Sequence, residues 1–524
     1  METVATEPSH EEQSRIRVGP LWRTALAVFL AALALRLPFR TQMAYYWDGA
    51  QYALAITDYN ATRSQPQAPG YFLYVMLGRV VNVLVHEPHG SLVWISVVAG
   101  AALAVGGYLL GTAMFGRGCG WAAAVILASS PLCWFHSEVA LTNIVDAVLV
   151  TGTILVCWLA VQENGRWRHV VALSVLMSLV AGVRQQSAPV LVPAWLYAFA
   201  GMRRPRWPKL AVGVALTSAL CLAWFVPMLH MSGGWTAYWQ AIAAKARFDA
   251  PKTPWRGGFA ALERNVDLIV EVCWAGLLMA AVIATMLLAW WMFAGGRANR
   301  QRFYSDHQRQ FRLLALWTVP MLASALGAYM TMTGYVLSYF PGLAIAVAAV
   351  VGKVKRRVVL VALLAVIAAV NCAAFLSLCQ GATQLMLGLP LTAVELREHD
   401  RTLAHEVALI RREFDPKDTI ICHGCQHFYW GFRQFQYHLP EYRNLLLDHD
   451  ASLVGDTATK FWLAQGGLTT FVDQLPDHSH ETMLLVVPPG LTTSIYHRFL
   501  DVQMAEPVSR QGLLYVLHAR AAQK

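Results

Sequence analysis

The sequence predicts an α-helical polytopic membrane protein that ends in a small α/β domain. Of its 524 residues, 56% are hydrophobic and only 14% are charged, whereas about a quarter of the residues of a soluble protein are charged. Apolar runs of spanning length recur from residue 20 to residue 380. From about Leu391 the composition becomes that of a soluble domain. These observations predict three parts: a tail (1–19), a transmembrane domain (20–380) and an α/β domain (381–524).

About eleven transmembrane helices are expected, together with juxtamembrane helices. A helix needs about 20 mostly apolar residues to cross the hydrocarbon layer. The expected spans are 20–38, 91–115, 119–136, 145–162, 169–184, 187–201, 210–230, 264–293, 313–331, 335–352 and 358–380. The apolar run 71–86 is shorter, with Gly78, Arg79, Asn82 and His86 on one helical face, which is typical of a helix lying in the interface.

The basic residues predict which way the chain faces. Arg15, Arg17 and Arg23 flank the first span and keep the N-terminus in the cytoplasm. If 71–86 lies flat, every other basic loop is cytoplasmic too, and an odd number of crossings places residues 381–524 outside. The net charge of +10 is then explained by orientation, and no nucleic-acid partner is expected. Two outer segments are long, a first outer loop (39–90) and a second one (231–262).

The C-terminal segment alternates helix and strand. A helix is expected over 400–414, strands over 419–422, 482–487 and 513–518, and a further helical stretch over 432–437. Cys422 and Cys425 flank His423-Gly424 in a C-x-x-C arrangement. A local disulfide, a zinc site and two unreactive thiols at a strand end all remain open for this pair.

Polar residues collect at the outer ends of the spans. Asp48 lies in an aromatic stretch just beyond the first span, within Tyr45-Tyr46-Trp47-Asp48-Gly49. An ionisable residue at a helix end can also be explained by snorkelling to the interface, and Asp48 by an aromatic belt with a solvated carboxylate. The other candidates are Glu138, Asp146, Arg184, Gln185, Arg63, Lys245 and Arg247.

The chemistry that fits this set is sugar transfer from a lipid phosphate. Nucleotide sugars are not available outside the membrane, so an outward-facing transferase needs a lipid-linked donor. A carboxylate must take the proton of the acceptor hydroxyl, and Asp48 is the expected base. Cations must stabilise the departing phosphate, and bidentate arginine suits that task. Arg184 is the first choice, with Gln185, Arg63, Lys245 and Arg247 as further phosphate contacts; Glu138 and Asp146 are supporting acids.

Several short segments resemble the GT-C glycosyltransferases. The acid of the first outer loop precedes a Pro-containing aromatic segment, Pro69-Gly70-Tyr71-Phe72-Leu73-Tyr74. Glu138 to Asp146 matches the second outer loop of that superfamily. Trp224-Phe225-Val226-Pro227-Met228 and Gly334-Tyr335-Val336-Leu337 are similar to segments of bacterial members. The resemblance covers about 15–380 and is narrowest to the dolichyl-phosphate-mannose–protein mannosyltransferase and lipid A aminoarabinose transferase group.

The resemblance implies an inverting transferase of the bacterial inner membrane that uses a polyprenyl-phosphate sugar, with Asp48 as base. The implied partners are that donor, membrane lipid, and a glycolipid, glycan or protein acceptor. Two departures matter: Gly49 follows Asp48 where many relatives have a second acid, and Gln67-Ala68-Pro69 replaces a basic residue with paired prolines. No cofactor and no obligatory divalent metal are therefore expected, and the phosphate contact shifts to Arg184.

Two other classes of function remain open. A secondary transporter would place its charged residues near the bilayer midplane, whereas these collect at the outer rim. A non-catalytic assembly protein would bind lipid phosphate without transferring sugar.

Overall fold

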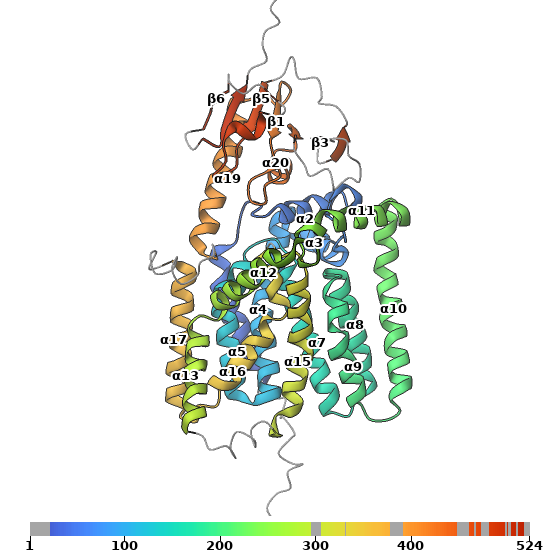
Figure 1. Ribbon diagram of the computed structural model, residues 1–524, viewed down its shortest axis with the longest axis vertical. Helices are drawn as coiled ribbons and strands as arrows, with labels where there is room; N and C mark the ends of the chain where they lie inside the picture. Colours follow the sequence, from blue (N-terminus) through green and yellow to red (C-terminus); the bar gives the residue numbers. More distant parts are fainter. Residues whose placement is uncertain are drawn as a thin grey trace, which may run out of the picture.

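The computed structural model describes residues 21–294, 305–330, 332–377, 391–447, 461–465, 468–472, 482–497, 500, 505–509 and 512–517. The predicted tail (1–19) lies outside these ranges. Figure 1 shows a bundle of long helices with a smaller α/β domain at one end. That end of the bundle is called the domain side below.

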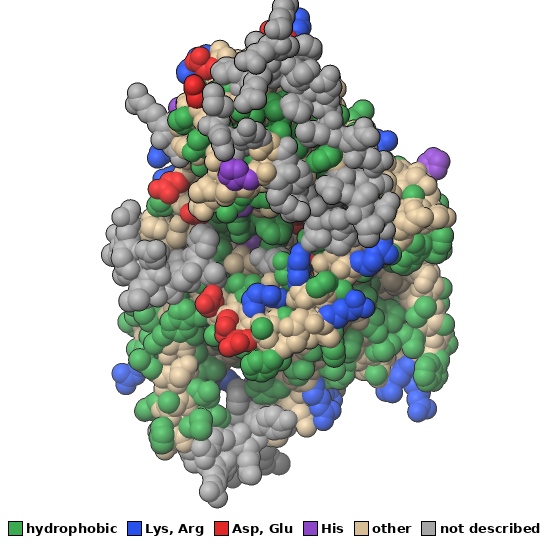
Figure 2. All heavy atoms as spheres, turned by 45° about the horizontal axis from the view of Figure 1, so that its top comes forward, with side chains coloured by type: hydrophobic (Ala, Val, Ile, Leu, Met, Phe, Trp, Pro, Cys, Tyr) green, Lys and Arg blue, Asp and Glu red, His purple; other side chains and the backbone are tan. Residues whose placement is uncertain are grey.

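The long helices alternate in direction through the bundle. They are α1 (Leu21–Arg36), α4 (Pro88–Phe115), α5 (Arg117–Ser129), α7 (Asn143–Gln162), α8 (Trp167–Val183), α9 (Ser187–Gly201), α10 (Arg206–Met231), α13 (Met279–Ala294), α15 (Gln308–Gly327), α16 (Phe340–Val351) and α17 (Arg357–Leu376). By length and composition five described helices could cross a membrane, or seven if two bent pairs count as spans. Hydrophobic side chains cover the sides of this bundle in Figure 2. The predicted helical membrane protein is confirmed, while the number of crossings stays a prediction.

Two predicted spans are each divided into two helices, and whether each bent pair crosses once stays a prediction. The segment 119–136 is α5 followed by α6 (Pro131–Ser137), with a 57° bend at Ser130-Pro131. The segment 264–293 divides at Leu278, whose φ of 40° ends α12 (Pro254–Leu277). Helix α13 then leaves at 88° to α12. Because α12 turns away from the direction of α13, only α13 runs along the bundle, as Figure 1 shows.

A second set of helices and turns covers the domain side of the bundle. They are α2 (Trp47–Thr57), the 3-10 turn η3 (Ala61–Arg63), α3 (Phe72–Val85), α11 (Gly234–Asp249), α12 and the 3-10 turn η5 (Thr333–Ser338). The segment 231–262 is therefore not a loop, since α11 and the start of α12 occupy most of it. Helix α3 has 14 residues and exposes Val80, Val83 and Leu84. Its flat position in the interface stays a prediction.

The C-terminal domain is built on a mixed sheet. Helix α19 (Ala393–Glu413) leads into β1 (Thr419–His423), and α20 (Phe432–His438) into β2 (Arg443–Leu446). The strand order is β4-β3-β2-β1-β5-β7-β6, with β1 parallel to β2 and β5 (Thr482–Val486). The remaining strands pair antiparallel: β3 (Phe461–Gln465), β4 (Leu468–Val472), β6 (Glu506–Pro507) and β7 (Leu514–Leu517). The predicted α/β domain is confirmed, although β2, β3, β4 and β6 were missed.

The C-x-x-C pair lies at the end of the central strand. Cys422 is fully buried in β1, and Cys425 is half-buried in the turn that follows. The two cysteines are not joined by a disulfide in the described part of the chain. Of the readings that the sequence left open, the local disulfide is therefore absent from this structure.

Two glycines allow α5 and α16 to pack closely. A Cβ atom added to Gly118 would lie 2.5 Å from the carbonyl oxygen of Gly352, which immediately follows α16. Small residues at helix interfaces are the usual means by which membrane helices approach each other. The Gly118–Gly352 contact therefore fixes how these two helices are placed.

Gly118→Ala should lower the free energy of unfolding by about 1–3 kcal/mol, because the methyl group overfills this contact. Thermal unfolding of the purified protein in detergent measures the effect. Gly152→Ala is the matched control, since a Cβ atom at Gly152 in α7 meets nothing within 4 Å. Equal unfolding temperatures for the two variants would contradict the importance of the α5–α16 contact.

Candidate active site

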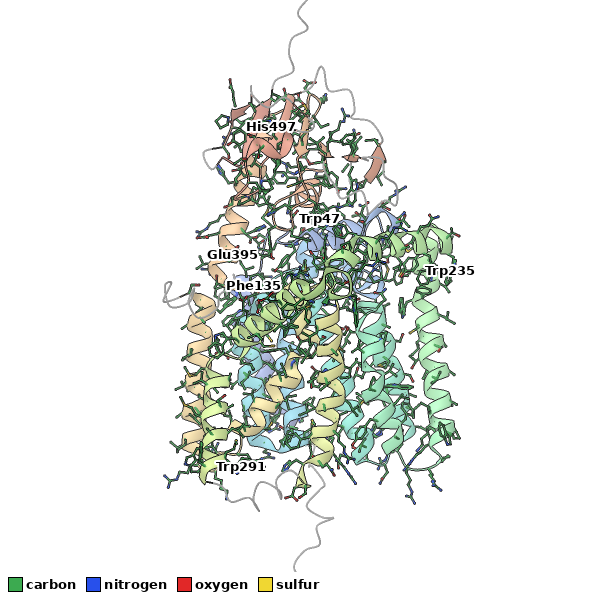
Figure 3. The ribbon with its side chains drawn as sticks, in the orientation of Figure 1. Trp47, Phe135, Trp235, Trp291, Glu395 and His497 are labelled. Carbon is green, nitrogen blue, oxygen red and sulfur yellow. The ribbon has the colours of Figure 1, made fainter. Side chains whose placement is uncertain are left out.

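Asp48 lies in the first turn of α2, at the junction of the bundle and the C-terminal domain. Tyr46 precedes α2 with extended backbone, and the main-chain N–H of Trp47 donates to the carbonyl oxygen of Phe428 at 2.7 Å. Figure 3 shows Trp47 between the two parts of the molecule. A carboxylate at a helix N-terminus is stabilised by the helix dipole. The local fold therefore places an acid at the base of the C-terminal domain.

The Asp48 carboxylate is nearly buried but retains one defined partner. Asp48 as a whole is only 7% exposed. Its side-chain oxygen Oδ1 accepts a hydrogen bond of 2.9 Å from Gln67 Nε2. Burial raises the pKa of Asp48 to about 6, against the opposing effect of the charges of Lys245 and Arg184. At neutral pH the carboxylate is therefore ionised and is a stronger base than an exposed aspartate.

Two cations act on Asp48 from different helices. Lys245 of α11 is held by Asp249 one turn later, with Nζ 2.8 and 2.7 Å from the two carboxylate oxygens. Arg184 follows α8 and is 7% exposed, and its guanidinium lies 4.8 Å from the centre of the Tyr335 ring. The Arg184 side chain makes no hydrogen bond or ion pair to any described residue. Its hydrogen-bond donors therefore have no protein partner among the described residues, although Arg184 does not itself line the cavity described next.

A cavity of about 390 Å³ opens beside Asp48. Residues of α2 and the following loop form one wall, α11 forms another, and Tyr329, Met332 and Tyr335 lie below them. The C-terminal domain closes the cavity with Gln426, Phe428 and Trp462. On the α11 wall, Ala237, Ala241 and Ala244 present only methyl groups. The volume is within the range of pockets that hold small molecules.

The Gln185 side chain stabilises the fold of the first loop. Its Nε2 donates to the carbonyl oxygen of Pro69 at 3.1 Å, and the Tyr238 hydroxyl donates to the same oxygen at 3.1 Å. The Tyr59 hydroxyl donates to the carbonyl oxygen of Gly70 at 2.8 Å, and Gly70 has a φ of 109°. Gln185 therefore holds the Pro69-Gly70 turn and does not line the cavity, contrary to the phosphate contact expected from the sequence.

Two other predicted phosphate contacts lie away from the cavity. The Arg63 guanidinium is 44% exposed and forms an ion pair with Asp58 at 3.8 Å. Arg247 is exposed on α11, on a different face from Lys245. Neither residue lines the cavity, because the helix and turn that carry them direct their side chains outward.

The two supporting acids are separated from each other. Asp146 lies in the first turn of α7, where its Oδ2 accepts a hydrogen bond of 2.8 Å from Ser187 and its charge acts on Arg184. Glu138 is fully buried near Arg36, and its main-chain oxygen accepts two hydrogen bonds from Thr41, at 3.1 and 2.7 Å. Asp146 therefore belongs to the surroundings of Arg184, whereas Glu138 supports the loop after α1.

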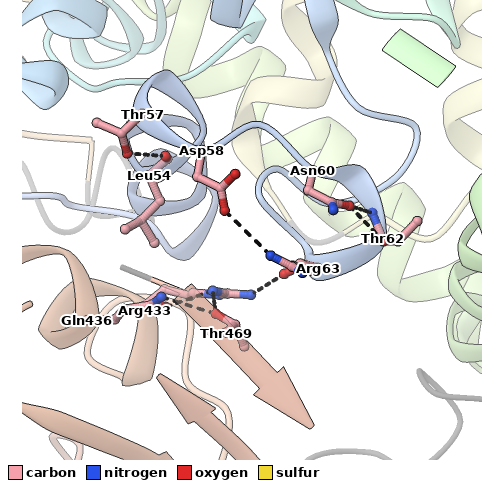
Figure 4. Close-up of polar contacts among 9 residues, drawn as sticks. All are labelled: Leu54, Thr57, Asp58, Asn60, Thr62, Arg63, Arg433, Gln436 and Thr469. Atoms are coloured by element: carbon pink, nitrogen blue, oxygen red, sulfur yellow. Dashed lines mark hydrogen bonds and ion pairs between the residues drawn. The ribbon is translucent and has the colours of Figure 1, made fainter. Parts of the chain in front are cut away.

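A buried arginine that no sequence pattern indicated ties the C-terminal domain to the cavity loop. Arg433 in α20 is fully buried; its Nη1 donates to Gln436 and Thr469 at 2.7 Å each, and its Nη2 donates to the main-chain oxygen of Arg63 at 2.9 Å. Figure 4 shows this bridge. The guanidinium also lies against the rings of Trp47 and Trp462. It therefore fixes the segment whose residues Thr62 and Ser64 line the cavity.

No group of three or more His, Cys, Asp or Glu side chains that could hold a metal ion occurs among the described residues. Asp48 and Asp249 both line the cavity, but Asp249 is engaged by Lys245.

The chain is similar to known membrane enzymes in sequence and in fold. Residues 68–230 match the family model described as dolichyl-phosphate-mannose-protein mannosyltransferase. The crystal structure of ArnT from Cupriavidus metallidurans bound to undecaprenyl phosphate has a TM-score of 0.60 and 11% identity, over 96% of this chain and 98% of that one. The crystal structure of the same protein in the apo state has a TM-score of 0.58 and 12% identity, over 95% of this chain and 97% of that one. No curated protein gives a significant match.

Arg433→Met should weaken the attachment of the C-terminal domain, because it removes three charged hydrogen bonds while keeping a long apolar side chain. Each such bond contributes about 1.5–3 kcal/mol. We expect a lower unfolding temperature and faster proteolysis between the two parts of the chain. Arg412→Met is the control, because Arg412 is exposed and pairs only with its neighbour Glu413. Similar proteolysis rates for both variants would contradict the bridging role of Arg433.

Proposed function

We propose that this chain, a GT-C superfamily protein by its fold and similar to the mannosyltransferase and ArnT group, is a membrane glycosyltransferase. It transfers a sugar from a polyprenyl-phosphate donor to an acceptor hydroxyl, with inversion. The observation that carries the proposal is the cavity lined by a buried carboxylate, Asp48, and by the cation Lys245, with Arg184 near enough for its charge to act on Asp48. A base and phosphate-binding cations are the two functions that this reaction requires.

The phosphate of the donor binds between Arg184 and Lys245. Arg184 supports this role because its buried guanidinium forms no hydrogen bond or ion pair with a described residue and lies over the Tyr335 ring. Lys245 supports it because its ammonium lines the cavity, held by Asp249 until an anion enters. Two cations match the charge of a monophosphate leaving group. Undecaprenyl phosphate, present in the similar ArnT structure, is the natural first ligand to test.

The transfer is a single displacement. The acceptor oxygen forms a bond to the anomeric carbon as its proton moves to the Asp48 carboxylate. The bond between that carbon and the phosphate oxygen breaks, and its electron pair leaves with polyprenyl phosphate. Gln67 holds the carboxylate through Oδ1, which leaves Oδ2 to receive the proton. Because the attacking and leaving oxygens lie on opposite faces of the sugar, the configuration inverts.

The site faces the extracytoplasmic side of the bacterial inner membrane in this proposal, and the C-terminal domain lies on that side.

The location of the cavity also bears on the rival function of transport. A secondary transporter holds its substrate midway along the bundle, between broken helices. Here the cavity lies at the domain side, bounded by α2, α11 and the C-terminal domain, which favours an enzyme that works at the membrane surface.

The direct test is a screen of the purified protein against polyprenyl-phosphate sugars, read by the release of polyprenyl phosphate. Turnover with at least one donor supports the proposal. A protein that binds undecaprenyl phosphate but releases none from any donor would instead be a non-catalytic lipid-phosphate-binding protein. Uptake of labelled solute by vesicles that persists in Asp48→Asn would indicate a transporter.

Asp48→Asn should reduce the rate of transfer by about 100- to 10,000-fold, the range that a general base contributes. The amide has the same shape but cannot accept the proton, so binding of undecaprenyl phosphate should change little. Transfer rate and lipid binding are measured on the same preparation. Substantial turnover by the variant would remove Asp48 from the mechanism.

The pH dependence of the wild type provides an independent control. A base with a pKa of about 6 is active when ionised, so the rate should fall as pH drops through about 6. Below that pH the rate should fall about tenfold for each unit. A rate that is level from pH 7 to pH 4 would contradict a raised pKa at the essential base.

Arg184→Ala should weaken the binding of undecaprenyl phosphate by about tenfold or more, because a charged hydrogen bond contributes about 1.5–3 kcal/mol. Equilibrium binding of the labelled lipid measures the loss. Arg63→Ala is the matched control, since the structure directs that arginine away from the cavity toward Asp58. Comparable losses for the two variants would argue against Arg184 as the phosphate ligand.

A further inference from the structure

The charged residues that line the cavity come from α2 and α11, whereas the described lining residues of the first loop (61–68) and of the C-terminal domain are uncharged; this uncharged part is called the neutral end below. The charged lining residues of the cavity, within the described ranges, are Asp48, Lys245 and Asp249, of which the last two form an ion pair with each other. The other polar lining side chains are uncharged: the amides and alcohols of Gln51, Thr62, Ser64, Gln67, Gln240 and Gln426, the phenols of Tyr329 and Tyr335, and the indoles of Trp47 and Trp462. Ser64 and Gln426 belong to the part bounded by the first loop and the C-terminal domain. That part offers hydrogen bonds but no described unpaired charge.

Phe428 is an exposed aromatic ring in the wall of this neutral end. It is 39% exposed although it lines the cavity. Its main chain is fixed, because its carbonyl oxygen accepts from the Trp47 N–H at 2.7 Å and from Gln434 Nε2 at 2.9 Å. The first of these bonds joins it to the residue next to Asp48. A rigid apolar ring is therefore held beside the proposed base.

Two polar side chains accompany this ring without partners of their own. Neither the Gln426 amide nor the Ser64 hydroxyl forms a hydrogen bond with a described residue. Ser64 is held in a left-handed conformation with a φ of 53°, where its main-chain N–H bonds to Ala61. An amide and an alcohol can each donate and accept, which is the combination that sugar hydroxyls require.

We infer that the acceptor is a neutral carbohydrate bound at this end of the cavity, an inference that rests on the proposed function. The apolar face of its ring packs on Phe428, its hydroxyls bond to Gln426 and Ser64, and one hydroxyl faces Asp48. An anionic acceptor would approach Asp48, and the described lining residues of the neutral end include no cation to pair with it. Burying a negative charge without a partner is costly, so the site discriminates against anionic acceptors.

The size of the cavity also favours a compact acceptor group over a peptide. About 390 Å³ must contain both the transferred sugar and the reacting end of the acceptor, which is near the lower limit for ligand pockets. An extended peptide is generally recognised through main-chain hydrogen bonds along a strand edge. The polar groups described for this neutral end are side chains.

The test compares three acceptors with a polyprenyl-phosphate sugar that the protein turns over. Octyl glucoside is the neutral probe, octyl glucuronide carries a carboxylate on the same ring, and a serine-containing octapeptide represents protein acceptors. We expect octyl glucoside to accelerate the release of polyprenyl phosphate more than the other two. Phe428→Ala should raise the KM for octyl glucoside about tenfold, the effect of losing one aromatic contact, while Phe428→Tyr should restore it.

Donor binding is measured separately, so that the two proposals can fail independently. Phe428→Ala should leave the affinity for undecaprenyl phosphate unchanged, and Leu491→Ala, exposed on the same domain outside the cavity, should alter neither quantity. Preference for the glucuronide or the peptide, no acceleration by octyl glucoside, or an unchanged KM in Phe428→Ala would overturn the inference. A wild-type protein that binds no undecaprenyl phosphate would overturn the proposed function itself.

Discussion

The geometry of the site depends on how the C-terminal domain binds the strip of chain that leads to Asp48. The carboxylate of Asp400 accepts from the N–H groups of Gln42 and Met43 at 2.7 and 3.0 Å. His438 Nε2 accepts from the N–H of Ala44 at 3.1 Å, and the Phe428 carbonyl oxygen accepts from Trp47. These acceptors satisfy donors of a segment without regular structure, which would otherwise be left unpaired.

This attachment connects the domain with the electrostatics of the base. Asp48 owes its raised pKa to burial, and Trp47, Phe428 and Trp462 help to keep water from that part of the cavity. The charges of Lys245 and Arg184 keep the same carboxylate ionised near neutral pH. A carboxylate that is both ionised and weakly solvated is suited to take a proton. The domain therefore helps to raise the pKa of Asp48, whereas the two cations lower it.

The sequence predicted the class of fold because apolar runs and basic loops are direct consequences of the bilayer. It missed the division between α12 and α13, although a signal was present: Glu263, Asp267 and Glu271 recur every four residues and mark one polar face. Such a face is typical of a helix at the surface of a bundle. The apolar residues of α13 concealed it, because the two helices follow each other almost without interruption.

The candidate site was predictable only in part. Asp48, Lys245 and Arg184 could be grouped because each lies at the same end of its predicted span or loop. The orientation of a side chain could not be predicted in this way, which is why Arg63, Arg247 and Gln185 were grouped with them. Phe428 and Arg433 were missed for another reason. Their contacts with the first loop join distant parts of the chain, such as the 370 positions between Arg63 and Arg433, and hydrophobic periodicity carries no information about such pairs.

The alanine wall of α11 has a consequence for the range of sugars that can fit. Ala237, Ala241 and Ala244 follow each other at helical spacing, so three methyl groups form an almost flat surface along the cavity. A larger side chain at Ala237, two turns before Lys245, would project into the opening and reduce its width away from that cation. A single exchange there can therefore narrow the choice of substrate while the reacting groups stay in place.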